Sequence, residues 1–444
     1  ITSTAPFWNL ELRNLTAVAR RFSLAPADNI GPTDIDIPAQ PLKVLNDFRI
    51  WGKESGGASY AGITFNPGIN EVYIGGSFFI ENGASYVPIG GGTPTYDAIA
   101  NQPTSRNTTY FNQTAGTGNV EVLYQGDPSN PVEIGNLVID RTNGFEVKLT
   151  SPLSRANESV VLDINGNVSV LSGTLNQNLF TIRTWGAIVN NDRMGTWYPG
   201  VTPSRAQIQF VENPALTLST AAGAVFGNVQ VNVTPPSLLT LTSNVFVERM
   251  EYVKGLIYLK NFNLKVDNLW NMEQGIFENS SANSYLKVAD VGQSGNSLIF
   301  TDGKASDGGL SLKISANSQV ENQPNILNNT GPTTFPVGFT TNGGTTVYFR
   351  PGQMVVKNFA DDGYVTIRPV LGPLSTVNSA GGEVLQQFWR VSSEGFNTAP
   401  TVSFRFYYRN RTGGGLMDLV IVNSANEANY VPGKVKDGNP YTRL

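Results

Sequence analysis

The stretch Val229-Gln-Val-Asn-Val233, followed after a short turn by Leu239-Thr-Leu241 and Val245-Phe-Val247, decides the fold class. In each segment apolar residues stand at every second position, which is the pattern of a half-buried β-strand. The residues between the segments include Pro, Ser and Asn, which favour turns. This part of the chain therefore predicts short strands joined by close turns.

The same alternation recurs toward both ends of the chain. Further examples are Val120-Glu-Val-Leu-Tyr124, Leu137-Val-Ile139, Phe145-Glu-Val-Lys-Leu149, Val168-Ser-Val170, Leu256-Ile-Tyr-Leu259 and Phe262-Asn-Leu-Lys-Val266. No amphipathic helix competes with this pattern. Strands this short favour a parallel β-solenoid with coils of roughly 20–25 residues, whose inward side chains stack in ladders. A chain of β-sandwiches has the same local pattern and is the less favoured alternative.

A degenerate internal repeat supports the solenoid. The segments Ile134-Gly-Asn-Leu-Val-Ile139 and Phe226-Gly-Asn-Val-Gln-Val231 match each other, and Phe7-Trp-Asn-Leu-Glu-Leu12 is a third, looser copy. A repeated unit of this kind is typical of proteins in which each coil packs only on its neighbours. We expect the three segments to be copies of one part of the coil.

The strands become longer and more aromatic after Phe335-Pro-Val-Gly338. They include Val347-Tyr-Phe-Arg350, Tyr364-Val-Thr-Ile-Arg368, Phe388-Trp-Arg-Val391 and Val402-Ser-Phe-Arg-Phe-Tyr-Tyr408. Long alternating strands rich in aromatic residues are typical of an antiparallel β-sandwich. The predicted organisation of this all-β chain is a parallel β-solenoid (β-helix) with irregular loops over residues 1–330, followed by an antiparallel β-sandwich over residues 331–444.

The composition excludes several classes of function. Only 14% of the 444 residues are charged, the net charge is −4, and the chain contains neither Cys nor His. Nucleic acid is not an expected partner, because its binding requires a concentrated basic face. Without thiol and imidazole groups, Cys nucleophiles, His bases and the usual zinc ligands are excluded.

The apolar residues are too scattered for a membrane span. No run approaches the roughly 18 apolar residues that a spanning helix needs. The sequence begins at Ile1 without a basic and then apolar leader. We therefore expect a soluble mature chain or trimmed fragment with no membrane span.

Part of the chain resembles a known family. The run Leu239-Thr-Leu-Thr-Ser-Asn-Val-Phe-Val247 is similar to a solenoid coil of large secreted surface proteins of Bacteroidetes. Thr334-Phe-Pro-Val-Gly338, Val365-Thr-Ile-Arg-Pro-Val370 and Gln387-Phe-Trp-Arg-Val391 continue in the order found in that family. The resemblance covers residues 206–410 well and residues 1–205 loosely.

What the resemblance implies is export by the type IX secretion system, and then display on the cell surface or release from it. Gliding adhesins are among the family members. The shared motifs belong to the fold and carry no catalytic residue. This chain departs from the family pattern because no C-terminal sorting domain is recognised in it.

Two segments offer oxygen ligands of the kind that Ca²⁺ prefers. The candidate ligands are Asp34, Asp36, Asp163, Asn165 and Asn167. The second segment begins like a calcium loop, but Thr174 stands at its twelfth position, where an acidic ligand is required. A solvated strand or loop is favoured for the first segment and a Gly-Asn turn for the second, so no cofactor is expected and Ca²⁺ is kept as the alternative.

Two further groups are weak candidates for a site. Trp197 and Tyr198 lie side by side in a predicted loop and could stack on a sugar ring, although packing onto the solenoid is favoured. Asp302, Lys304 and Asp307 share one Gly-rich stretch and are the best hint of an enzyme, since a β-helix lyase uses acids with a basic residue. One loop supplies too few groups, so the chain is not expected to be an enzyme.

These patterns favour a non-catalytic, extracellular structural or adhesive protein of the bacterial cell surface, with a filament or surface-layer subunit among the options. The expected partners are copies of itself or other cell-surface proteins, and polysaccharide is a further option. Two alternatives stay open. A β-helix polysaccharide lyase or hydrolase would need carboxylates stacked across one groove. A carbohydrate-binding module would need a row of exposed aromatic side chains.

Overall fold

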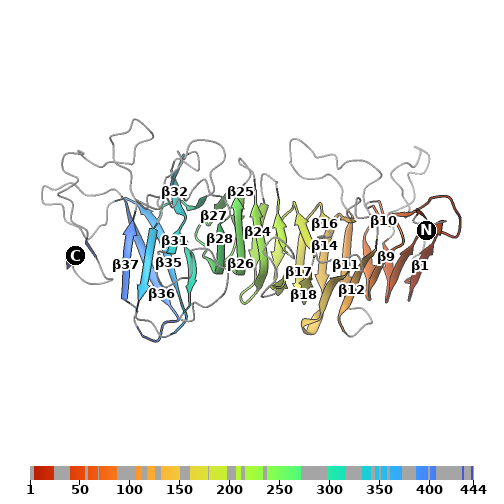
Figure 1. The fold of residues 1–444 in the computed structure, drawn as a ribbon, viewed down its shortest axis with the longest axis horizontal. Helices are drawn as coiled ribbons and strands as arrows, with labels where there is room; N and C mark the ends of the chain where they lie inside the picture. Colours follow the sequence, from red (N-terminus) through yellow and green to blue (C-terminus); the bar gives the residue numbers. More distant parts are fainter. Residues whose placement is uncertain are drawn as a thin grey trace. The chain divides into compact units, whose positions relative to one another are not determined.

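The computed structural model describes residues 5–24, 41–55, 59–68, 70–87, 107–112, 118–125, 132–150, 161–178, 180–197, 207–211, 216–233, 238–271, 298–315, 333–341, 346–349, 352–357, 361–372, 387–398, 401–406, 433–434 and 442–443. The elements in these ranges are β-strands, apart from the 3-10 helix η1 (Thr142–Gly144). The chain divides into two compact units, unit 1 (Ile1–Lys254) and unit 2 (Gly255–Leu444). The predicted all-β fold class is confirmed (Figure 1).

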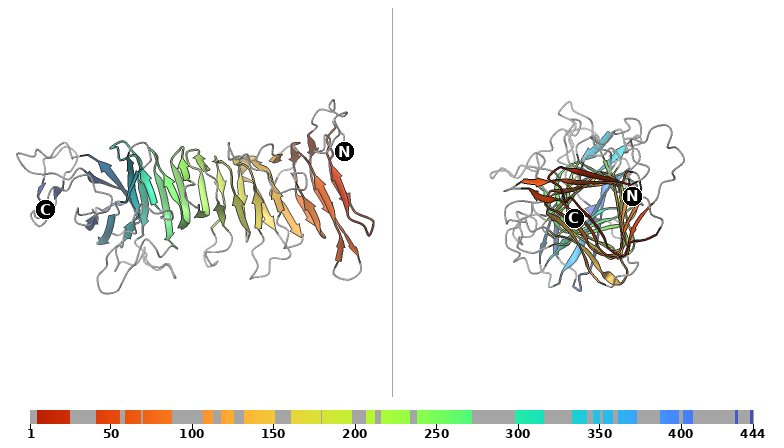
Figure 2. Two further views of the ribbon diagram at one scale, coloured as in Figure 1. Left: turned by 90° about the horizontal axis from the view of Figure 1, so that it is seen from above. Right: turned by 90° about the vertical axis from the view of Figure 1, so that its right-hand side faces the viewer.

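Unit 1 is a parallel β-solenoid, as predicted, and its coils have three faces. The first face contains, in pairing order, β3 (Leu42–Val44), β8 (Val72–Ile74), β11 (Thr108–Asn112), β14 (Asn136–Asp140), β17 (Val168–Ser172), β20 (Ile188–Asn190), β23 (Leu216–Thr220) and β25 (Leu238–Leu241). The second face contains β1 (Leu10–Arg13), β4 (Phe48–Trp51), β9 (Phe78–Glu81), β12 (Val120–Gln125), β15 (Glu146–Thr150), β18 (Thr174–Asn176) and β21 (Arg193–Met194). Every pairing in these two faces is parallel, and Figure 2 shows the strands of unit 1 one behind another in chain order.

The third face is built from two sets of parallel strands. They are β2 (Arg20–Ser23), β7 (Ile63–Asn66) and β10 (Ala84–Tyr86), then β13 (Val132–Ile134), β16 (Val161–Ile164), β19 (Thr181–Thr184) and β22 (Ile208–Phe210). The longer β24 (Val225–Asn232) pairs with both β21 and β22, and β26 (Val245–Lys254) follows it. A small antiparallel hairpin of β5 (Lys53–Ser55) and β6 (Ser59–Ala61) lies apart from the faces.

The core of unit 1 consists of the alternate residues that point inward. In β24 and the residue that follows it, Val229, Val231 and Val233 are buried as predicted, whereas Gln230, at an alternate position, is buried as well. Near the N-terminus the core is aromatic, and Phe48 stacks on Phe78 with ring centres 5.1 Å apart. Burial raises the pKa of Tyr86 in this core to about 12.

The corners between faces bring neighbouring coils very close. The side-chain oxygen Oδ1 of Asn136 accepts a hydrogen bond from the backbone N–H of Asn167, and Oδ1 of Asn167 accepts one from Ala187, both at 2.9 Å. Beside them lies the corner column of Gly135, Gly166 and Gly186. A Cβ atom added to Gly186 would be 2.4 Å from the carbonyl oxygen of Gly166, so this contact requires glycine.

The coils differ in length more than predicted. Val168 pairs with Ile188, 20 residues later, whereas Val72 pairs with Thr109, 37 residues later. The strand register is kept across these coils of unequal length.

The three motif copies do not occupy equivalent places, so that part of the repeat prediction is wrong. Asn136 begins β14 of the first face, whereas Asn228 lies inside β24. Asn9 immediately precedes β1 of the second face. The shared letters reflect two different local roles: corner hydrogen bonding for Asn9 and Asn136, and a buried strand position for Asn228.

Unit 2 begins with parallel pairing and then changes to antiparallel pairing. Its parallel strands are β27 (Leu256–Tyr258), β29 (Leu298–Thr301) and β32 (Val337–Thr341), together with β28 (Leu264–Asn271) and β30 (Leu310–Ile314). The antiparallel pairings join β30 to β35 (Gly363–Leu371) and β36 (Gln387–Glu394), β32 to β33 (Thr346–Phe349), and β31 (Thr333–Phe335) to β34 (Gly352–Lys357) and β37 (Thr401–Phe406). A last pair joins β38 (Gly433–Lys434) and β39 (Thr442–Arg443).

The predicted C-terminal sandwich stays a prediction. The antiparallel strands are present, but Val391 and Phe404 are exposed at 38% and 42%. The change in pairing direction falls at β31 and β32, because β31 pairs antiparallel while β32 still pairs parallel with β29, whereas the compact units divide between Lys254 and Gly255. The predicted boundary at residues 330 and 331 lies beside the first of these features and within unit 2.

Candidate interaction surface

The predicted calcium ligands of the second segment already have protein partners. Asp163 lies on β16 directly opposite Arg183 of β19, and its two carboxylate oxygens accept hydrogen bonds from the guanidinium group at 2.6 Å each. Asn165 is buried, and its amide nitrogen is 3.4 Å from a carboxylate oxygen of Glu133. The oxygen of Asn167 accepts from the next coil.

Their arrangement is therefore that of a strand end and a corner, with each side chain bridging neighbouring coils. Asp34 and Asp36 lie outside the described residues. In the part of the chain that the structure describes, no three acidic side chains gather in a way that could hold a metal ion. The calcium hypothesis stays a prediction.

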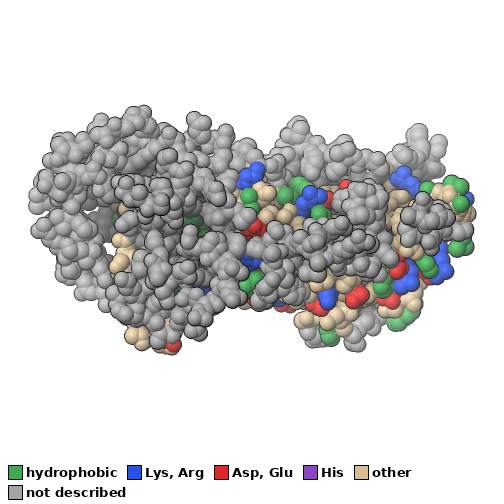
Figure 3. All heavy atoms as spheres, viewed as in Figure 1, with side chains coloured by type: hydrophobic (Ala, Val, Ile, Leu, Met, Phe, Trp, Pro, Cys, Tyr) green, Lys and Arg blue, Asp and Glu red, His purple; other side chains and the backbone are tan. Residues whose placement is uncertain are grey.

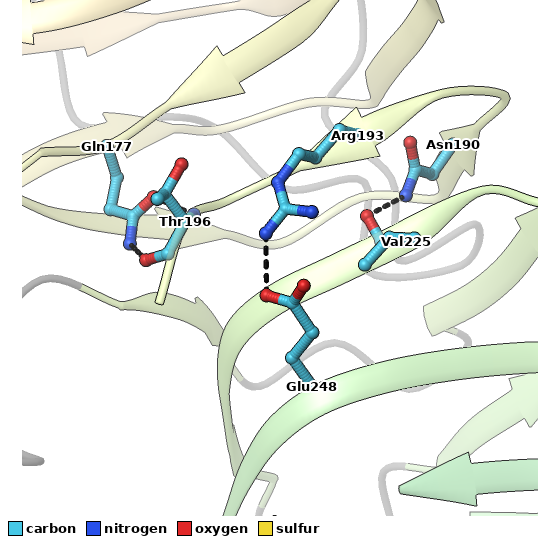
Figure 4. A network of polar contacts seen from close by, with 6 residues as sticks. All are labelled: Gln177, Asn190, Arg193, Thr196, Val225 and Glu248. Atoms are coloured by element: carbon cyan, nitrogen blue, oxygen red, sulfur yellow. Dashed lines mark hydrogen bonds and ion pairs between the residues drawn. The ribbon is translucent and has the colours of Figure 1, made fainter. Parts of the chain in front are cut away.

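Trp197 follows a backbone segment that is clamped to the coil before it. The buried side chain of Gln177 donates to the carbonyl oxygen of Thr196 at 2.6 Å and accepts from its N–H at 2.7 Å (Figure 4). Trp197 is half-buried beyond this clamp, and Tyr198 lies outside the described residues. The clamp fixes the start of the predicted loop.

The same region of Figure 4 contains a pair of opposite charges. Arg193 of β21 reaches Glu248 of β26 at 2.6 Å, across β24. Gly227 of β24, which has no side chain, lies beside the backbone of Gly195. The arginine can therefore pass over β24 to the second coil along.

The two acidic residues of the Gly-rich stretch in unit 2 have different hydrogen-bond partners. Asp302 accepts hydrogen bonds from the hydroxyl group of Tyr258 and, at 3.2 Å, from Lys304. These contacts lower the pKa of Asp302, with the Tyr258 hydrogen bond as the largest cause. Asp307 is buried and accepts from the backbone N–H of Lys304 at 2.7 Å, and burial raises its pKa.

This geometry shapes a loop by hydrogen bonding. Lys304 donates to both carboxylates, through its side chain to Asp302 and through its backbone N–H to Asp307. An acid and base pair in hydrolysis would instead face each other across a substrate. The enzyme hypothesis for these residues stays untested.

The outer surface of the first coils carries a pattern that the sequence did not reveal. Charged and aromatic side chains alternate over β1, β4 and β9, and we call this set the N-terminal mosaic. Its members are Glu11, Arg13, Arg49, Trp51, Phe79 and Glu81. The guanidinium carbon of Arg13 lies 4.4 Å from the centre of the Trp51 ring, and that of Arg49 lies 4.6 Å from Phe79. Arg49 also pairs with Glu81 at 3.1 Å.

The first face also has an aromatic contact between neighbouring coils. Tyr73 of β8 and Tyr110 of β11 are in register, and their rings stack with centres 4.4 Å apart. Both hydroxyl groups donate to the carboxylate of Glu71, at 2.7 and 3.1 Å. Burial and the Glu71 carboxylate raise the pKa of both tyrosines. The stack covers one face of each ring along the coils.

The first coil also exposes apolar side chains. Among the described residues six large hydrophobic side chains are exposed, and three of them flank β1: Trp8 at 59%, Leu15 at 74% and Val18 at 64%. The loop with Leu15 and Val18 is held by the buried Asn14, whose amide nitrogen donates to the carbonyl of Val18 at 2.8 Å. Hydrophobic, basic and acidic side chains are interspersed at this end of unit 1 (Figure 3).

The sequence held one signal of this surface. In Leu10-Glu-Leu-Arg13 the outward Glu11 and Arg13 carry opposite charges and alternate with the inward Leu10 and Leu12. The cross-coil pairing of Arg13 with Trp51 could not be predicted, because the register between coils of unequal length is not visible in the sequence.

Comparison with known proteins does not assign this chain to a family. No protein-family model, no curated protein and no solved structure matches this chain. Among the residues that the structure describes, none of the helical segments has the length and hydrophobicity of a membrane span.

Proposed function

We propose that this chain is a non-catalytic structural or adhesive protein of the bacterial exterior, in which the β-solenoid acts as a stiff spacer. The observation that carries the proposal is the use of carboxylates as braces between coils. Asp163 binds Arg183, Glu248 binds Arg193, and Glu71 accepts from two stacked tyrosines. Side chains committed in this way stiffen the coil stack and are not poised for acid and base chemistry.

Location is part of the proposal. The similarity of residues 206–410 to secreted surface proteins of Bacteroidetes, described above, supports export by the type IX secretion system. The absence of Cys and the low share of charged residues are compatible with a large extracellular β-protein. In this setting copies of the chain or other surface proteins are its partners.

Protease shaving of intact cells that express the native gene tests the location. We expect an antibody raised against residues 1–444 to label intact cells or the culture medium, and shaving to remove the cell-bound signal. Signal that appears only after lysis would contradict the proposal.

A panel of acidic and neutral polysaccharides tests the absence of catalysis. We expect no release of reducing ends or unsaturated products from any of them. Activity that disappears in Asp302→Asn or Asp307→Asn would establish the alternative, a polysaccharide lyase or hydrolase. Retention on a polysaccharide column that is lost in Trp197→Ala would favour a carbohydrate-binding module.

A further inference from the structure

Two arginines face each other in the antiparallel part of unit 2. Arg368 of β35 lies directly opposite Arg390 of β36, and residues in such positions have their side chains on the same face of the sheet. Like charges placed in this way destabilise the strand pair. Locally unfavourable contacts of this kind are expected at functional sites. An anion between the two guanidinium groups would remove the repulsion.

Arg368 is half-buried, and none of the residues that the structure describes provides a hydrogen-bond acceptor for its guanidinium group. Burial lowers the pKa of Arg368, the charge of Arg390 lowers it further, and the carboxylate of Asp307 raises it. That carboxylate is itself buried and accepts from the backbone N–H of Lys304 at 2.7 Å. The N–H donors of Arg368 are therefore available to a ligand.

Arg390 is exposed and makes one hydrogen bond, from Nη1 to the carbonyl oxygen of Ala305 at 3.0 Å. A guanidinium group carries several N–H donors in a planar fork, so this bond leaves the others unused. Forked donors of this kind match the two oxygens of a carboxylate. Arg368 and Arg390 together can thus hold one carboxylate between them.

Short hydroxyl side chains lie next to the arginines on the same face. Thr366 and Ser392 are directly opposite each other, two residues along the same two strands. Thr366 donates to the hydroxyl oxygen of Ser311 at 3.0 Å, and Ser392 is exposed. Beyond these hydroxyl groups, Lys265 and Glu394 form an ion pair at 2.6 Å. The surface between the arginines and this ion pair therefore presents hydroxyl groups.

We propose that Arg368, Arg390, Thr366 and Ser392, together called the arginine surface, bind an acidic polysaccharide that contains uronic acids. The carboxylate of one uronic acid accepts hydrogen bonds from both guanidinium groups, and hydroxyl groups of the sugar exchange hydrogen bonds with Thr366 and Ser392. The inference names a ligand for the adhesive role in the proposed function and rests on that function for its biological use.

The chemistry of this surface favours a sugar over other anionic partners. Nucleic acid requires a concentrated basic face, whereas the chain has a net charge of −4 and two arginines here. A lipid surface would need exposed apolar side chains beside the cations. Hydroxyl groups occupy that place instead. A ligand with one carboxylate and several hydroxyl groups per unit matches both parts of the arginine surface.

Titration calorimetry of the full chain with a short oligogalacturonate tests the proposal. We expect binding that weakens as salt is added, and no binding of the same oligosaccharide after its carboxylates are reduced to alcohols. Arg368→Gln and Arg390→Gln should each weaken binding by about tenfold or more, since each removes charge-assisted hydrogen bonds. Arg368→Lys keeps the charge without the fork and should lose less.

Two control variants separate binding from charge and from folding. Arg193→Gln makes the same change of charge in unit 1 and should bind as the wild type does. Arg390→Glu replaces the facing like charges with opposite charges, so it should stay folded and yet fail to bind. Thermal unfolding of each variant verifies the fold, and misfolding cannot then imitate the loss.

A wild type that does not bind would overturn the inference, as would equal binding of the reduced oligosaccharide or unchanged binding in both glutamine variants. Displacement by inorganic sulfate at the concentration of the oligosaccharide would show an adventitious ion only. Retention that is lost in Trp197→Ala but kept in Arg368→Gln would place sugar binding elsewhere. Protease shaving reads location without these arginines, so the proposed function and this inference can fail separately.

Discussion

One strand pair in unit 1 and one in unit 2 each place two charged side chains directly opposite each other, with opposite electrostatic results. In unit 1 the parallel register places Asp163 directly opposite Arg183, and each of the two carboxylate oxygens accepts a hydrogen bond. In unit 2 the antiparallel register of β35 and β36 places Arg368 directly opposite Arg390. Opposite charges at such positions stabilise a sheet, and like charges destabilise it.

The difference shows what parallel coiling allows. When strands repeat in register, one favourable contact can be followed by another in the next coil, as Asn136, Asn167 and Ala187 show at one corner. In the antiparallel strands that the structure describes in unit 2, the polar contacts do not form such a column and instead join residues that differ from one strand to the next. Arg390, for example, donates to the carbonyl oxygen of Ala305 at 3.0 Å.

The largest expected effect comes from the buried arginine of unit 1. Arg141 is fully buried and donates to the carbonyl oxygens of Gly75 and Gly118, each at 2.9 Å, so it joins residues from separate coils. Arg141→Ala should lower the free energy of unfolding by about 3–5 kcal/mol, through a cavity and two buried acceptors without donors. Urea unfolding followed by circular dichroism measures the loss.

A surface arginine of the same unit serves as the control. Arg193→Ala removes a partly exposed ion pair with Glu248 and should cost about 1 kcal/mol or less. Equal losses in the two variants would contradict the assignment of Arg141 as a bridge between coils.

The second effect tests the close approach at a coil corner in each unit. Gly186→Ala should destabilise unit 1 by about 2–3 kcal/mol, since the added Cβ meets a backbone carbonyl at 2.4 Å. Gly308→Ala is the matching change in unit 2, where the nearest backbone oxygen, that of Phe262, lies at 1.6 Å. Thermal unfolding with hydrogen exchange assigns each loss to its unit.

The control for this pair is Gly144, which has a φ of +72° and open space around its Cβ position. Gly144→Ala should cost about 1 kcal/mol from backbone strain alone. If it proves as damaging as Gly186→Ala, close coil contact is not the reason for the corner glycines.

The third effect concerns the corner hydrogen bonds. Asn167→Ala should cost about 1 kcal/mol, because the backbone N–H of Ala187 loses its acceptor. Asn167→Asp keeps an acceptor and should be nearly neutral, which separates hydrogen bonding from side-chain volume. Chemical denaturation of both variants in parallel decides between them.

A fourth, smaller effect should be a gain. Arg390→Glu replaces the facing arginines of β35 and β36 with an ion pair and should stabilise unit 2 by about 0.5 kcal/mol. Arg390→Gln, which removes the repulsion without adding attraction, should give a smaller gain. A loss in both variants would mean that the bond to Ala305 outweighs the repulsion.

The smallest effect is a pH dependence in unit 2. The pKa of Asp302 is lowered in the folded protein, so its stabilisation is present above the ordinary aspartate pKa of about 4 and is lost as pH falls through the lowered value. Asp302→Asn should therefore lower the melting temperature at pH 7 slightly and make no difference in strong acid. The pKa of Asp307 is raised in the folded protein, so its charged form costs stability above that pKa. Asp307→Asn should therefore raise the melting temperature slightly at pH 7 and lose this advantage in strong acid.

Much of the fold followed from the residue pattern. The alternation at Val168-Ser-Val170 and Leu239-Thr-Leu241 predicts strands, and both segments lie in the first face of unit 1 with their apolar residues buried. Local alternation is sufficient here, because a strand in a solenoid buries one side whatever its partner is.

The parts that could not be predicted depend on register between coils. Arg141 and Gln177 are polar residues in the core, and nothing nearby in the sequence distinguishes them from surface residues. The same limit applies to the N-terminal mosaic, where Arg13 meets Trp51 only because 38 residues separate strands that turn out to be neighbours. The predicted Trp197 and Asp163 sites relied on local motifs, and the structure places both residues beside contacts from other coils.

The unequal coils of unit 1 separate the length of the gene from the length of the rod. Each coil advances by one strand spacing of about 4.8 Å, whether it takes 20 residues or 37. The advance per residue therefore varies from roughly 0.13 to 0.24 Å within one unit. Insertions in the connections between strands would change the lateral surface of the solenoid. Only a whole added coil would change its length along the axis.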